Sequence, residues 1–137
     1  MMNKMLLLAG AFVCGALSAN AQCEEYTSGP YIDFNPAPCN GQSEMIESFE
    51  VFASEAYYMD GIHENAVYTF SICNGPGAGS WVPDFTIITP SETIDAFGEG
   101  DGCSISWTAS ETGTYLILIN ELDSCGIPNT IDNGFPM

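Results

Sequence analysis

The chain has 137 residues, with 18 aspartates and glutamates against a single lysine or arginine, and a formal charge of −17 at pH 7. This length supports one domain with one core. The near absence of cationic side chains argues against nucleic-acid binding and against attraction to anionic membranes. The hydrophobic content of 46% argues against a disordered acidic tail.

Residues 1–21 have the three parts of a secretory signal peptide. Lys4 supplies the positive charge, an apolar run covers residues 5–17, and Ala19-Asn20-Ala21 is an A-x-A cleavage site. The apolar run is too short for a transmembrane span. We therefore predict cleavage before Gln22 and export to the periplasm, the cell surface or the medium.

Cleavage at this point would remove Lys4, the only lysine or arginine of the chain, and leave His63 as its only histidine. Every carboxylate must then be hydrated, accept hydrogen bonds from backbone N–H groups or bind a cation. Two interpretations of the acids stay open. They form a solubilising surface, or some of them cluster to hold Ca²⁺.

The exported chain has five cysteines: Cys23, Cys39, Cys73, Cys103 and Cys125. In an exported protein these are disulfide candidates first, and no C-x-x-C or Cys/His spacing indicates zinc. We prefer the pairs Cys23–Cys39 and Cys73–Cys103, which leave Cys125 free or bound to another chain. Each bridge is typically worth ~2–4 kcal/mol.

In chain order, residues 22–45 read as a loop-rich strap that contains three prolines and one short apolar run, Tyr31 to Phe34. Residues 46–53 follow, with apolar side chains on one face, and residues 56–62 are a second candidate strand. Residues 66–73 alternate clearly, as a half-buried strand does. A glycine-rich loop then covers residues 74–80.

The second half continues with short runs that are separated by Gly, Pro, Asn and Asp. Residues 85–89, 94–97 and 103–108 are candidate strands, and residues 115–119 are apolar on both faces, as in a covered central strand. This pattern predicts an all-β fold: a single antiparallel β-sandwich of Greek-key or jelly-roll type, stapled by disulfides. Residues 46–137 would form the sandwich, in one domain with the strap.

Four segments carry a family resemblance: residues 68–73 (YTFSIC), 84–87 (DFTI), 103–109 (CSISWTA) and 112–119 (TGTYLILI). They resemble the β-sandwich domains of secreted bacterial proteins that are similar to pre-peptidase C-terminal domains and, more loosely, to CUB domains. The resemblance covers residues 46–125 and implies a non-catalytic accessory, adhesive or binding role. Such domains usually accompany a catalytic or adhesive domain, for which this chain has no room.

The stretch from Gly98 to Gly102 alternates glycine with the acids Glu99 and Asp101. It does not fit an EF-hand loop, but these two acids, with Asp84 or Asp95 added by the fold, could supply Ca²⁺ ligands. The alternative, which we favour, is a hairpin connection whose glycines allow positive φ and whose acids keep the tip soluble.

Aromatic rings offer a second type of site, because flat rings stack on sugars. Trp81, Tyr57, Tyr58 and Tyr31 are the candidates, and Trp81 follows the glycine-rich loop, where exposure is plausible. Ordinary core packing is the alternative for all four, and we expect Trp107 to lie in the core.

We expect no catalytic activity, since the chain has no G-x-S-x-G elbow and no H-E-x-x-H motif, and His63 reads as an exposed loop residue. Three hypotheses follow. The first is an exported binding or adhesion module for glycan or protein ligands. The second is a Ca²⁺-stabilised structural protein of the envelope or matrix, and the third, more remote, is a small secreted hydrolase.

Overall fold

A computed structural model describes residues 22–34, 41–43, 45, 50–99 and 101–137. The predicted signal peptide and Cys39 lie outside the described residues, and so does most of the strand expected at residues 46–53. In the described part no helix is long and apolar enough to cross a membrane.

The described chain is all-β, as the sequence predicts. The strands are rich in β-branched and aromatic residues, and the connections between them hold most of the described glycines and prolines. A single 3₁₀ turn, η1 (Asp101–Cys103), lies between two of the strands. The strands are β1 (Ser28–Phe34), β2 (Glu55–Ile62), β3 (Val67–Ser71), β4 (Pro83–Ile88), β5 (Ile94–Glu99), β6 (Ser104–Thr108) and β7 (Gly113–Glu121).

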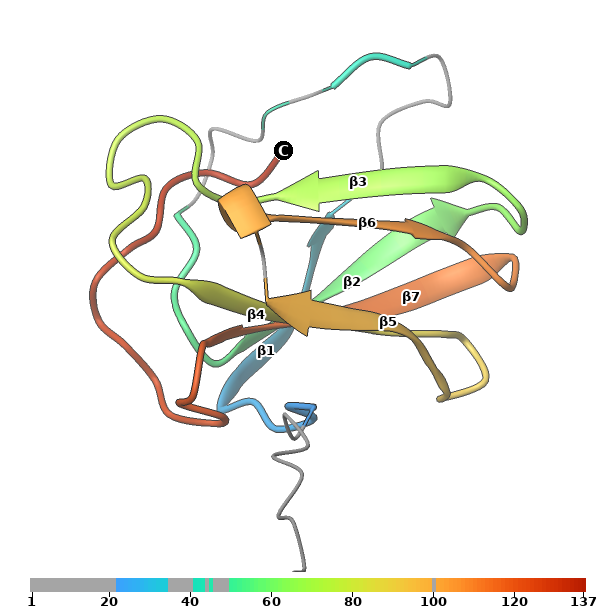
Figure 1. The fold of residues 1–137 in the computed structure, drawn as a ribbon. Helices are drawn as coiled ribbons and strands as arrows, with labels where there is room; N and C mark the ends of the chain where they lie inside the picture. The colour runs from blue at the N-terminus through green and yellow to red at the C-terminus, as the bar shows by residue number, and fades with distance from the viewer. Residues whose placement is uncertain (1–21, 35–40, 44, 46–49, 100) are drawn as a thin grey trace, which may run out of the picture.

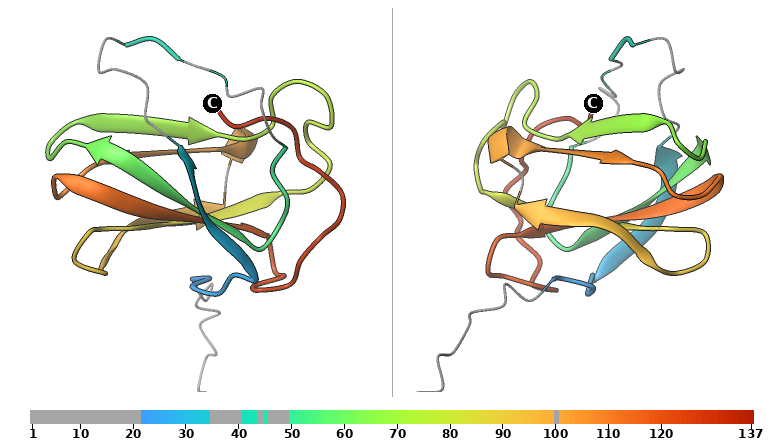
Figure 2. Two further views of the ribbon diagram at one scale, coloured as in Figure 1. Left: turned by 180° about the vertical axis from the view of Figure 1, so that it is seen from behind. Right: turned by 45° about the vertical axis from the view of Figure 1, so that its right-hand side comes forward.

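The strands form two sheets that stack face to face (Figure 1). The large sheet has the order β1-β2-β7-β4-β5, and the small sheet consists of β3 and β6. All ladders are antiparallel except that of β1 with β2, which is parallel. The chain changes sheet at four connections, so β7 reaches its central place between β2 and β4 only after the small sheet is complete. Figure 2 shows the two layers from behind and in an oblique view.

The core lies between the two sheets and is built by alternation. Tyr115, Ile117 and Ile119 point inward from β7, and Phe70 of the small sheet meets Phe85 of β4 edge to face, with ring centroids 5.9 Å apart. Such an edge-to-face contact adds to the burial of apolar area.

The first part of the predicted strap, residues 22–27, is a loop, and residues 28–34 form β1 of the large sheet. This first part, which we call the strap from here on, crosses the outer face of the large sheet, the face turned away from the small sheet. The hydroxyl of Thr86 donates to the carbonyl of Cys23 at 2.6 Å, and the Asn120 amide donates to the carbonyl of Glu25 at 3.0 Å. Leu118 of β7 therefore stays buried although it points away from the core. This confirms that β7 is covered on both faces at Leu118, whereas Leu116, two residues earlier on the outer face, is only half-buried.

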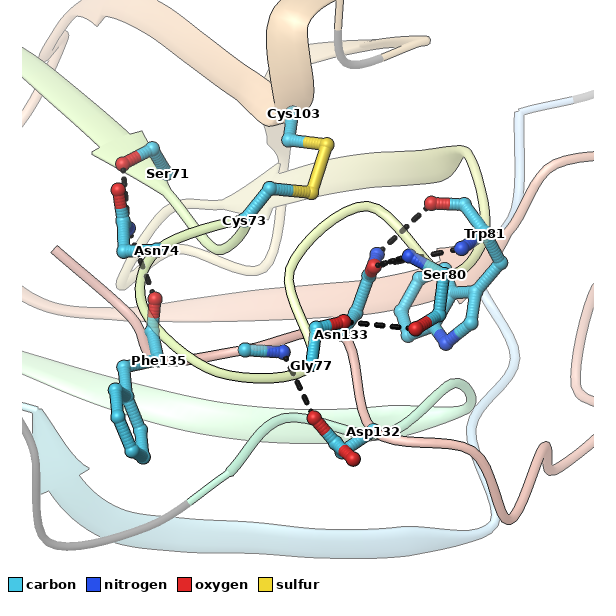
Figure 3. Close-up of a disulfide and its surroundings, with 11 residues drawn as sticks. Ser71, Cys73, Asn74, Gly77, Ser80, Trp81, Cys103, Asp132, Asn133 and Phe135 are labelled. Atoms are coloured by element: carbon cyan, nitrogen blue, oxygen red, sulfur yellow. Dashed lines mark hydrogen bonds between the residues drawn. A yellow bond between two sulfur atoms is a disulfide. The ribbon is translucent and has the colours of Figure 1, made fainter.

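Two disulfides hold this arrangement. Cys73 and Cys103, with Cα atoms 5.5 Å apart, join the end of β3 to η1, which confirms the predicted pair (Figure 3). β3 ends at Ser71, so Cys73 lies beyond the strand. The alternation of the strand residues therefore no longer directs its side chain away from Cys103.

The predicted pair Cys23–Cys39 and the unpaired Cys125 are wrong. Cys23 bonds to Cys125, with Cα atoms 5.4 Å apart and a sequence separation of 102. The reason is that the strap runs across the outer face and brings Cys23 beside the loop that follows β7. Short sequence separation favours a bridge only when the intervening chain turns back on itself.

Because Cys23, Cys73, Cys103 and Cys125 are paired, we predict one reactive thiol in the exported chain, at Cys39. Alkylation without reduction, followed by peptide mass mapping, measures this directly. Cys125→Ser should lower the free energy of unfolding by about 2–4 kcal/mol, whereas Cys39→Ser should leave it nearly unchanged. Alkylation of Cys125 in the unreduced wild-type protein would contradict the pairing.

Candidate functional site

The four acids proposed as Ca²⁺ ligands do not meet at one place. Asp84 of β4 and Glu99 of β5 are direct cross-strand neighbours. Asp95 lies at the other end of β5, where its Oδ2 accepts a hydrogen bond from the Ser110 N–H at 3.1 Å. Asp101 lies in η1. Among the described residues, no group of three or more His, Cys, Asp or Glu side chains could hold a metal ion.

Asp95 is separated from the acid pair along β5, because it stands near the start of the strand and Glu99 stands at its end. The ladder of β4 with β5 also shifts register beside Asp95, between Ile87 and Ile88. Ile87 pairs with Ala96, but Ile88 pairs with Ile94, so one extra residue of β5 stands opposite β4 at this point. A β-bulge of this kind re-aims the side chain at the shift. The carboxylate of Asp95 accepts a hydrogen bond from the Ser110 N–H beside this shift, far along β5 from Asp84.

Burial raises the pKa of Asp84, and the neighbouring carboxylates of Glu99 and Asp123 raise it further. No cationic side chain is available to reverse this effect, because Lys4 is the only lysine or arginine in the chain. The carboxylates of Asp84 and Glu99 are therefore held close together by the register of β4 with β5, although they repel each other.

The glycine loop is not a hairpin. It leaves β5 in the large sheet and enters β6 in the small sheet, through η1. Gly102 has φ 64° and Cys103 has φ 60°, so the chain turns sharply before the disulfide. The expected hairpin connection is wrong, because β5 and β6 lie in different sheets and do not pair with each other. The expectation that a glycine adopts a positive φ in this connection is confirmed at Gly102.

Trp81 is in the core and not on a sugar-binding surface. Its side chain is 6% exposed, and its Nε1 donates to the carbonyl of Ile131 at 2.9 Å. Asn133 fixes the backbone here: its Oδ1 accepts from the Ser80 N–H at 2.8 Å, and its Nδ2 donates to the Trp81 carbonyl at 2.9 Å (Figure 3). The sequence did not reveal this contact, since 52 residues separate Asn133 from Trp81.

The remaining rings do not form one platform. Tyr57 is buried, and its hydroxyl donates to the carboxylate of Glu55. Tyr31 lies on the same side of the large sheet, at its β1 edge, with its ring centroid 5.3 Å from that of Tyr57, and it is 42% exposed. Tyr58 alternates with Tyr57 and is exposed on the outer face. His63 is exposed in the loop after β2, as expected.

The outer face carries a set of apolar side chains that the sequence did not single out. Cross-strand register places them in adjacent positions: Tyr58 opposite Leu116, Leu116 opposite Ile88, and Ile88 opposite Ile94. Phe97 lies opposite Thr86, one position further along the sheet. We call Tyr58, Leu116, Ile88, Ile94 and Phe97 the outer-face strip.

The outer-face strip is open to solvent. Tyr58, Ile94 and Phe97 are 39%, 37% and 57% exposed, and the two aliphatic side chains between them are half-buried. The strap covers the neighbouring positions at Thr86 and Leu118 but leaves the strip uncovered. Contiguous exposed apolar side chains on a folded domain mark an interaction surface more often than isolated ones do.

Acids flank the strip at both ends. Asp60 stands beside Tyr58 on β2, where its Oδ1 accepts from the Thr114 hydroxyl at 2.8 Å. The cross-strand acids Asp84 and Glu99 flank the Phe97 end. The surface therefore has an apolar centre and a negative rim.

We compared the chain with protein-family models, with curated proteins and with solved structures, and found no match in any of the three.

We predict that Asp84→Asn stabilises the protein at pH 7. The pKa of Asp84 is raised in the fold, so the protonated carboxyl contributes fully to the free energy of unfolding below its ordinary pKa of 3.8. That contribution is lost as the pH rises through the raised value, and the ionised carboxyl is unfavourable at pH 7. The gain should be less than about 1 kcal/mol, since the carboxyl keeps contact with water. Urea melts at pH 7 and at pH 3 measure it.

The gain should disappear at pH 3, where both the folded and the unfolded carboxyl are protonated. Glu64→Gln, in the exposed loop after β2, removes the same charge away from the acid pair and is the control. An equal gain in both variants would show that only the net charge matters.

We further predict that CaCl₂ and NaCl of equal ionic strength raise the melting temperature equally. Both salts screen the repulsion among the acids, and no described cluster offers Ca²⁺ a specific site. A larger rise with Ca²⁺ at micromolar concentration, removed by Asp84→Asn or by Glu99→Gln, would contradict this and identify a specific site.

Proposed function

We propose that this protein is an exported, non-catalytic binding module that holds a protein partner on its outer-face strip. The observation that carries the proposal is the strip itself. A chain with a net charge of −17 has acids enough to cover this face, yet five neighbouring positions on it are apolar. The role agrees with the one implied by the resemblance to secreted accessory domains.

The chemistry of the partner follows from the rim. A partner with apolar side chains at its centre and lysine or arginine around them would bury the strip and pair with Asp60, Asp84 and Glu99. A neutral glycan is less well supported, because the strip itself contains only two rings, those of Tyr58 and Phe97. A second copy is also less well supported, since two chains of charge −17 repel each other.

The location of the partner follows from the disulfides. Cys23–Cys125 fixes the strap beside the strip, and Cys73–Cys103 fixes the small sheet. Such bridges persist in oxidising compartments, so they fit a periplasmic or extracellular protein. We therefore expect the partner to be found there too.

Two synthetic peptides of equal charge test this proposal. One is an amphipathic lysine–leucine peptide and the other is a lysine–serine peptide of the same length and lysine spacing. The wild-type protein should bind the leucine peptide about tenfold more tightly, because burial of one or two apolar side chains against the strip contributes roughly 1–3 kcal/mol. Fluorescence anisotropy at several salt concentrations measures both affinities.

Phe97→Ser and Tyr58→Ser should each reduce the preference for the leucine peptide while leaving the salt-dependent binding of both peptides in place. Val82→Ser, which removes an exposed apolar side chain away from the strip, is the matched control. Equal binding of the two peptides by the wild-type protein would contradict the apolar contact. Binding of an uncharged glycan that is lost in Tyr58→Ser would assign the strip to a different class of ligand.

A further inference from the structure

The free edge of the small sheet has a defined hydrogen-bonding pattern. The carbonyl of Ala66 accepts from the Ala109 N–H at 2.9 Å, and the Ile72 N–H donates to the Cys103 carbonyl at 3.1 Å. The backbone groups of the even-numbered residues of β3 thus face β6. Those of Val67, Thr69 and Ser71 face the opposite edge, because successive residues of a strand alternate in direction.

The C-terminal residues show what this edge accepts. The Ser71 N–H donates to the Met137 carbonyl, and the Met137 N–H donates to the Ser71 carbonyl, both at 2.8 Å. Figure 1 shows the C terminus beside the end of β3. Ser71 and Met137 therefore form one hydrogen-bonded pair of a ladder. No hydrogen bond between described residues uses the backbone groups of Thr69 or Val67, the next two positions on this edge.

The side chains near this edge do not protect it. Natural sheets discourage added strands with lysine, proline or inward-pointing charges on edge strands. β3 (VYTFS) has none of these, and neither has β6 (SISWT). Val67 is 71% exposed. In so acidic a chain, β3 and β6 thus bring no charged side chain to this edge.

The two sheets differ in width, which is a second feature of this edge. The large sheet has five strands and the small sheet has two. On the inner side of the large sheet, at its β1 edge, Tyr31 stays 42% exposed although it packs against Tyr57. A strand added beside β3 would widen the small sheet and extend the cover over this side of the large one.

We propose that the β3 edge receives an extended segment of another protein, antiparallel to β3 and in line with residues 133–137. Backbone hydrogen bonds to Val67 and Thr69 would provide the recognition, as in other cases of strand addition. The segment would alternate apolar and polar residues and carry basic instead of acidic flanks, because the whole chain is negative. This surface is separate from the outer-face strip.

A second copy of the chain fits this edge less well. Since Met137 occupies the position of Ser71, two β3 strands could pair only through Val67 and Thr69 of each copy. That short ladder would have to overcome the repulsion between two chains of charge −17.

The probe is a labelled peptide, KKSISWTKK, which copies β6 between lysines, because β6 already forms an antiparallel ladder with β3. Amide hydrogen exchange measured by NMR is the readout. The Val67 and Thr69 amides should exchange rapidly in the free protein and become protected at saturating peptide. The Tyr68 and Phe70 amides should be protected in both states, since they bond to β6.

Val67→Pro removes an edge N–H at the first residue of β3, where a strand tolerates proline. It should weaken peptide binding by about tenfold, whereas Val67→Thr, which keeps the N–H, should bind like the wild type. KKSIPWTKK, a peptide that cannot complete the ladder, should bind poorly to all three proteins. Thermal melts confirm that each variant folds.

Three results would overturn the proposal. The first is the absence of protection at Val67 and Thr69 with millimolar peptide. The second is loss of protection at Tyr68 and Phe70, which would mean that the peptide replaces β6. The third is self-association of the wild-type protein that Val67→Pro abolishes, which would assign the edge to a second copy.

Discussion

The absence of cationic side chains after Lys4 is the constraint on which the rest of this structure depends. Carboxylates in an ordinary domain are satisfied in part by lysine and arginine, but here neutral groups must serve. Backbone N–H groups and hydroxyls of the described residues take this role, as the Phe52 N–H does for Glu55, the Ser110 N–H for Asp95, and the Ser91 hydroxyl for Glu111. Neutral donors satisfy a carboxylate without the full Coulombic gain of an ion pair.

Two acids show the limit of this solution. Burial raises the pKa of Glu55 even though the Tyr57 hydroxyl and the Phe52 N–H both lower it. Burial also raises the pKa of Asp84, and there two nearby carboxylates add to the effect. Stability must therefore come from apolar packing and from the covalent links. This explains why the segments at both ends of the described chain are fastened to the sandwich, the strap by Cys23–Cys125 and the C-terminal residues by Asn133 and by the pair of Ser71 with Met137.

The sequence predicted what depends on local alternation and failed where distant segments meet. Residues 66–73 alternate as a half-buried strand does, and residues 115–119 are a continuous apolar run, so β3 and β7 could be located. The cover over Leu118 agrees with that apolar run. The partner of Cys23 and the burial of Trp81 each depend on where another segment passes. The separation of Asp95 from Asp84 depends on the register of β4 with β5. The outer-face strip was missed for a related reason. Its members come from four strands, and only their register brings Tyr58, Leu116 and Ile88 into adjacent positions.

The two surfaces that we propose for binding share a property that follows from the same constraint. The outer-face strip and the β3 edge are neutral, while the rest of the described surface carries many of the acids. Charge at the rim attracts a basic partner over roughly a Debye length, about 8–10 Å at physiological salt, and affects mainly the rate of encounter. Contact free energy then comes from apolar burial on the strip, or from backbone hydrogen bonds at the edge, which salt screens little. A partner recruited in this way would associate faster at low salt but would dissociate at a rate that salt changes little. If binding depended on the acids alone, added salt would both slow association and speed dissociation.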